Sequence, residues 1–89
     1  MHKTEVGWTR QDEEGQKIDV FARRVGREWQ FFARQRRYDQ WERIPQPSLD
    51  DWMELLDGVR RRVNRQLLRP EEEGHVEGLI RQQYPEAEF

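Results

Sequence analysis

The chain of 89 residues contains no cysteine, which excludes disulfides, thiolate zinc sites and a cysteine nucleophile. No stretch approaches the ~18 consecutive apolar residues of a membrane span. The N-terminus lacks the basic and then apolar pattern of a signal peptide. We therefore expect a protein of the reducing cytoplasm that has no membrane partner.

Residues suited to catalysis are also scarce. Ser48 is the only serine, and its position before an apolar helical pattern favours a helix-capping role. The two histidines, His2 and His75, cannot be combined with carboxylates into the three or four converging ligands of a metal site. Gly74 and Gly78 lack the Lys-Ser/Thr pair of a phosphate-binding loop. We expect no enzymatic activity, no metal and no cofactor.

The most distinctive features of the sequence are its aromatic residues and its segregated blocks of charge. Four Trp, four Phe and two Tyr distinguish this chain from disordered sequences of similar charge. The formal net charge of −2 conceals segregation, because residues 23–43 carry a net +4 and residues 71–89 a net −5. Residues 44–59 carry four acids and no base, and residues 60–69 carry five arginines and no acid.

Residues 18–34 predict a β-hairpin with one apolar face. If the turn is centred on Val25-Gly26, alternation by two places aliphatic and aromatic side chains together. The apolar pairs are then Ile18 with Ala33, Val20 with Phe31, and Ala22 with Trp29. The opposite face pairs Arg23 with Glu28, Phe21 with Gln30, and Asp19 with Phe32, which makes Phe21 and Phe32 diagonal neighbours. A type II-like turn or a four-residue loop over residues 24–27 fits this register, because only Gly26 then needs a positive φ.

A strand over residues 4–10 is expected before this hairpin, followed by a turn over residues 11–15. We favour the register that pairs Trp8 with Ile18 and Val6 with Val20, since it groups apolar residues. A four-residue loop would instead pair Val6 with Phe21. Beyond Arg34, residues 35–44 either extend the third strand or form a short fourth one, and residues 44–47 form a stiff proline connector.

Two helices are predicted in the C-terminal half. Ser48 caps a helix over 48–68, with Asp51 three residues later as a shortened capping box. Its apolar stripe is Leu49, Trp52, Leu55, Leu56, Val59, Val63 and Leu67. Its arginines, Arg60, Arg61, Arg62, Arg65 and Arg69, are interpreted as a solvated face that complements the helix dipole rather than as a phosphate grip. A shorter helix over 71–84 follows, with Val76, Leu79 and Ile80 on its apolar side and Tyr84 as a further candidate.

The predicted fold is therefore one small α+β domain, residues 1–89. It is a three-stranded antiparallel meander, or one with a short fourth strand, packed against a long helix and a shorter C-terminal helix. The predicted core is Ile18, Val20, Trp29, Phe31, Trp52, Leu56, Val59 and Val63.

Two binding functions fit the sequence. The first is a non-enzymatic protein-interaction module, because aromatic and arginine residues on a sheet surface are enriched at interface hot spots. A second copy of the chain would satisfy the same residues, which are Phe21, Phe32, Arg34, Arg36 and Arg37. The alternative is single-stranded RNA or DNA binding by the basic hairpin. That surface comprises Arg23, Arg24, Arg27, Phe32, Arg34, Arg36, Arg37 and Tyr38, although these residues also suit pairing with nearby acids.

Overall fold

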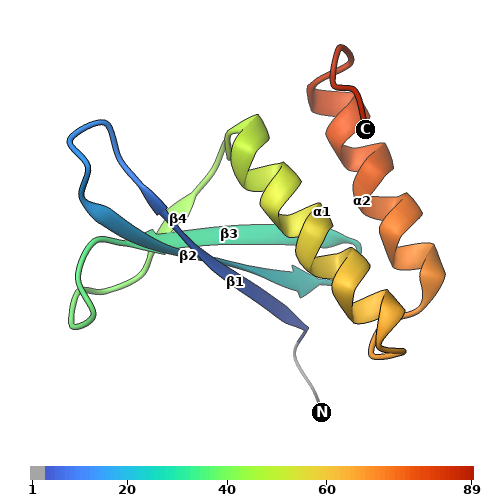
Figure 1. The fold of residues 1–89 in the computed structure, drawn as a ribbon, viewed down its shortest axis with the longest axis horizontal. Coiled ribbons are helices and arrows are strands. Elements are labelled where there is room, and N and C mark those ends of the chain that lie inside the picture. Colours follow the sequence, from blue (N-terminus) through green and yellow to red (C-terminus); the bar gives the residue numbers. More distant parts are fainter. Residues whose placement is uncertain (1–3) are drawn as a thin grey trace. The chain divides into compact units, whose positions relative to one another are not determined.

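The computed structural model describes residues 4–89 and confirms the α+β class. Residues up to Pro47 and residues Ser48–Phe89 form two compact units. The first unit is an antiparallel meander in the order β1-β2-β3-β4, and the second is a helix pair (Figure 1). The strands are β1 (Glu5–Gln11), β2 (Lys17–Val25), β3 (Glu28–Arg34) and β4 (Glu42–Ile44), and the helices are α1 (Leu49–Asn64) and α2 (Pro70–Gln83).

The hairpin of β2 and β3 has the predicted faces but a different register. Val25 lies opposite Glu28, so the two-residue turn is Gly26-Arg27 rather than Val25-Gly26. Gly26 has φ +62, as the first position of a type II′ turn requires, and this turn matches the twist of the strands. The predicted pairs were therefore wrong by two residues.

This shift exchanges partners within each face. Phe31 lies opposite Ala22 instead of Val20, and Phe32 lies opposite Phe21 instead of Asp19. Because the shift is even, no side chain changes face. Phe31 is 1% exposed and Phe32 is half-buried, as the alternation predicts.

The hairpin of β1 and β2 is also shifted by two residues from the favoured register. Trp8 lies opposite Val20 and Val6 opposite Ala22. Asp12 organises the connecting loop: its carbonyl accepts from Gly15 N at 3.0 Å, and its Oδ1 accepts from Glu14 N and Gln16 N at 2.9 Å each. Asp12 N also donates to the Gln16 carbonyl at 2.9 Å, which leaves a three-residue loop over residues 13–15. Gly15, the last of these, has the left-handed φ of +81 that such a loop requires.

One face of the sheet holds the buried strand residues of the first unit. Trp8 packs edge-on against Phe31, with ring centroids 6.0 Å apart, and Ile44 of β4 lies opposite Phe31. The short fourth strand, rather than a longer third one, completes the meander. The buried side chains of this apolar face are Val6, Ile18, Val20, Ala22, Trp29 and Phe31.

Helix α1 begins at its predicted cap and ends four residues early. The Ser48 hydroxyl accepts from Asp51 N at 3.1 Å, which satisfies one of the free N–H groups of the first turn. At the other end, Leu67 N donates to the Arg62 carbonyl at 2.8 Å and Gln66 N to the Val63 carbonyl at 3.0 Å. These two bonds define a Schellman motif, in which Gln66 takes the left-handed position at φ +62.

The early end of α1 explains two errors in the predicted apolar stripe. Leu67 lies beyond the helix and is 67% exposed, and Val63 in the last turn is only half-buried. The other predicted core residues are buried. Three more residues of the second unit, Leu55, Val76 and Ile80, had been assigned only to an apolar stripe. The buried apolar residues of this unit are Trp52, Leu55, Leu56, Val59, Val76 and Ile80.

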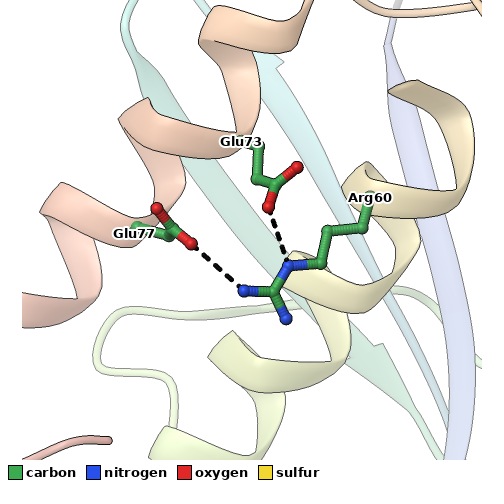
Figure 2. Close-up of polar contacts among 3 residues, drawn as sticks. All are labelled: Arg60, Glu73 and Glu77. Carbon is green, nitrogen blue, oxygen red and sulfur yellow. Dashed lines mark hydrogen bonds and ion pairs between the residues drawn. The ribbon is translucent and has the colours of Figure 1, made fainter. Parts of the chain in front are cut away.

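Arg60 joins α1 to α2, which contradicts its assignment to a solvated face. Its Nε donates to Glu73 Oε2 at 3.0 Å and its terminal nitrogen to Glu77 Oε2 at 3.1 Å (Figure 2). The hydrogen bond to Glu73, aided by Glu77, raises the pKa of the Arg60 guanidinium above its usual value despite some desolvation. Within residues 4–89, neither helix is long and apolar enough to cross a membrane.

Candidate interaction surface

The sheet face opposite the apolar face carries a cluster of aromatic and arginine side chains. Alternation along β2 and β3 brings Phe21, Arg23, Phe32 and Arg34 to this face. Trp41 immediately precedes β4, at the position where the β3–β4 register places it opposite Arg34. We call the five residues Phe21, Arg23, Phe32, Arg34 and Trp41 the aromatic–arginine cluster.

Three rings form the centre of this cluster. Phe21 and Phe32 are direct cross-strand partners, not diagonal neighbours as predicted, and they stack with centroids 4.9 Å apart and planes 17° from parallel. Trp41 meets Phe21 edge-to-face, with centroids 4.7 Å apart at 88°. Stacked and T-shaped pairs of this kind contribute about 0.5–1.5 kcal/mol each beyond burial. The rings therefore hold one another in fixed positions while Phe21 and Phe32 stay half-buried and Trp41 is 37% exposed.

Two arginines lie against these rings. The guanidinium carbon of Arg34 is 4.2 Å from the Trp41 ring centroid, and that of Arg23 is 5.4 Å from the Phe32 centroid. Arg34 also forms an ion pair with Asp19, with Nε and Oδ2 3.6 Å apart. Cation–π contacts at partly exposed sites contribute about 0.5–1 kcal/mol each. Both arginines are half-buried, and the Nε atom of each is covered without a hydrogen-bond partner among the described residues.

The remaining predicted site residues lie in the loop between β3 and β4. Arg36 donates from its terminal nitrogen to the Tyr38 hydroxyl at 3.0 Å, and its backbone N donates to Asp39 Oδ2 at 3.2 Å. Arg37 is exposed beside it. The structure therefore joins Phe21, Phe32 and Arg34 in one cluster and places Arg36 and Arg37 on an adjacent, internally bonded loop.

Sequence reasoning missed Trp41, and it assigned Arg23 to the alternative nucleic-acid surface rather than to a contact with Phe32. Trp41 sits in a stretch without clear alternation, so its strand register was undefined until β4 was located. The signal that could have found it is parity: a short strand ending at Ile44 with its apolar residue on the apolar face requires Trp41 on the opposite face.

A shallow pocket of about 740 Å³ opens at the end of the sheet that carries the β1–β2 and β3–β4 loops. Its walls include three arginines and three acids, with Ile18, Ala33 and Ile44 among the apolar contributors. The charged residues are Arg10, Arg34, Arg43, Asp12, Asp39 and Glu42. The equal numbers of opposite charges give it no preference for an ion of either sign, so it contributes less to a functional assignment than the cluster does.

No group of three or more His, Asp or Glu side chains suited to a metal ion occurs among the residues that the structure describes. His75 is half-buried on α2, whereas His2 lies outside the described residues. Comparison with known proteins identifies no matching family model, no similar curated protein and no similar solved structure.

Proposed function

Since no related protein supplies a function, we propose from the site alone that the chain is a non-enzymatic protein-interaction module. Its contact surface is the aromatic–arginine cluster. The observation that carries the proposal is the three-ring arrangement of Phe21, Phe32 and Trp41, pre-ordered by stacking yet still accessible. Rigid aromatic anchors flanked by arginine are the side chains most enriched at interface hot spots.

Pre-ordering favours binding because the entropy of fixing the rings has already been lost on folding. An immobilised side chain otherwise costs about 0.5–1.5 kcal/mol at the moment of association. Further burial of three partly exposed rings then contributes about 25 cal/mol for each Å² of apolar surface removed from water. The cluster is therefore suited to a partner that covers it with apolar atoms.

The ring geometry favours a protein over single-stranded nucleic acid. Bases bind such proteins by stacking on open ring faces. In this cluster Phe21 and Phe32 cover one face of each other, and the Arg34 guanidinium lies over Trp41. Fewer open faces remain for bases than on a flat stacking platform. We propose the cytoplasm as the location, consistent with a chain without cysteine.

Selection from a random dodecapeptide display library tests this proposal. Enriched peptides are titrated by fluorescence anisotropy against the wild type and against Phe32→Asp, with Trp41→Thr as a second variant outside the regular strands. Leu67→Asp, which places the same charge at an exposed apolar position in the other unit, is the matched control.

We expect at least tenfold weaker binding, or about 1.4 kcal/mol, for Phe32→Asp and Trp41→Thr, and unchanged binding for Leu67→Asp. Circular dichroism establishes that each variant is folded. Peptides that bind all four proteins equally would overturn the proposal. Tight binding of short mixed-sequence RNA or DNA, lost steeply as salt is added, would replace it with the nucleic-acid alternative.

A further inference from the structure

The aromatic–arginine cluster has an excess of positive charge on its β4 side. Arg43, on β4, lies opposite Phe32. Arg34, on β3, lies opposite the position of Trp41. The adjoining loop adds Arg36 and Arg37. Within residues 4–89, neither Arg37 nor Arg43 has an ion-pair partner, and Asp19 is paired with Arg34. This side of the face therefore has cations available for an incoming carboxylate.

Three acids lie on the same face. Asp19, on β2, is paired with Arg34, Glu5 is on β1, the opposite edge strand, and Glu28 is beside the turn between β2 and β3. The face is thus polarised across the sheet, from Glu5 on β1 to Arg43 on β4.

The β1 side of the face has a gap next to Phe21. Gly7 is the residue directly opposite Phe21, so no side chain covers the ring from that strand. A Cβ placed on Gly7 would meet only the Val20 carbonyl oxygen at 3.6 Å and Phe21 Cβ at 3.9 Å, which are ordinary contacts. Glycine within a strand costs stability and often marks a position where another molecule approaches closely.

The gap is therefore not required by the fold. Gly7 does not have a positive φ, and the space would accept a Cβ without displacing its neighbours. A side chain from a bound molecule can occupy this space and contact Phe21.

We propose that the partner of this face is an acidic protein segment with one apolar anchor residue, an inference that rests on the proposed function. The anchor occupies the gap at Gly7 beside Phe21, and carboxylates pair with Arg43 and, on the adjoining loop, with Arg37. Arginine binds carboxylates with two parallel hydrogen bonds, which gives directional selectivity as well as affinity.

The sheet geometry sets the spacing of this motif. Three inter-strand steps separate β1 from β4, which amounts to about 14 Å at 4.7–4.9 Å a step. An extended segment that crosses the strands covers this distance in about four residues at ~3.3 Å each. The anchor and the first carboxylate should therefore be separated by about three to five positions.

The selected dodecapeptides and two point variants test this inference. Peptides that depend on Phe32 are aligned, and one is synthesised with its acids intact and with each acid replaced by lysine. We expect an aromatic or large aliphatic residue three to five positions from Asp or Glu. Arg43→Glu should weaken the acidic peptide at least tenfold and strengthen the lysine version.

The Gly7→Val variant fills the gap and so tests whether a peptide side chain occupies it, while the thermal midpoint reports any effect on folding. Valine favours extended backbone, so this variant should retain or raise the thermal midpoint while its affinity for the acidic peptide falls at least tenfold. Thr9→Val, on the same strand and face, is the matched control and should bind normally.

The outcomes distinguish this inference from the proposed function. Phe32-dependent peptides that are basic or uncharged, or that bind Gly7→Val normally, would overturn the acidic-anchor inference and leave the interaction surface intact. Peptides whose binding does not depend on Phe32 would overturn the proposed function itself.

Discussion

Replacing Gln66 with glycine should stabilise the second unit. Gln66 occupies the left-handed position of the Schellman motif at φ +62, where a Cβ crowds the following carbonyl oxygen. Removing that Cβ relieves about 1–2 kcal/mol of strain. Glycine also has greater freedom in the unfolded chain, which costs about 0.5–1 kcal/mol. The expected net gain is about 0.5–1 kcal/mol.

Thermal unfolding followed by far-ultraviolet circular dichroism measures this gain. For a chain of this length, 1 kcal/mol corresponds to about 4–8 °C, so Gln66→Gly should raise the midpoint by about 2–8 °C. Gln66→Ala retains the Cβ and should show no such increase. The reasoning would be refuted if the glycine variant melted at or below the wild-type midpoint, or if alanine gave an equal gain.

Three further substitutions test local parts of the structure. Ser48→Ala removes the acceptor for Asp51 N and should cost about 1 kcal/mol in urea unfolding, whereas Ser48→Asp should restore most of it. Arg60→Met breaks two partly exposed ion pairs and should cost about 0.5–1 kcal/mol, with faster amide exchange in α2 than in α1. Because the Arg60 pKa is raised, the stabilisation from these ion pairs is complete below the usual arginine pKa and is lost only above the raised value. The loss of stability in Arg60→Met should therefore be constant from about pH 7 to pH 10. Gly26→Ala should destabilise the sheet by about 1 kcal/mol through its positive φ, and an unchanged urea midpoint would contradict the assigned turn.

Alternation predicted the faces of the sheet but could not determine the register of either hairpin. Moving the second turn from Val25-Gly26 to Gly26-Arg27 changes every pair by two residues and leaves each side chain on its face. Both positions of the turn give Gly26 the positive φ. The hydrophobic pattern was therefore satisfied equally well by the wrong partners.

The errors in the helices have different physical origins. The end of α1 depends on a left-handed residue, and sequence rules associate that position with glycine or asparagine rather than Gln66. The contacts of Arg60 lie 13 and 17 residues away, beyond the reach of helical periodicity. The Ser48 cap, by contrast, is a local interaction, and the sequence predicted it correctly.

The candidate site also combines features that local sequence predicts with contacts between distant segments that it does not. Strand parity was sufficient to place Phe21, Phe32 and Arg34 on one face, as the structure confirms. Their stacking and the approach of Trp41 depend on the registers of β2, β3 and β4 together. No single segment of sequence contains that information.

Chemical-shift mapping of the labelled protein with a selected peptide tests the interaction surface most directly. Changes in ¹H–¹⁵N spectra should concentrate at Phe21, Phe32, Arg34 and the Trp41 indole, with ring contacts between the two phenylalanines visible in the free protein. Perturbations confined to α1 and α2, or the absence of any contact between the rings of Phe21 and Phe32, would contradict the account.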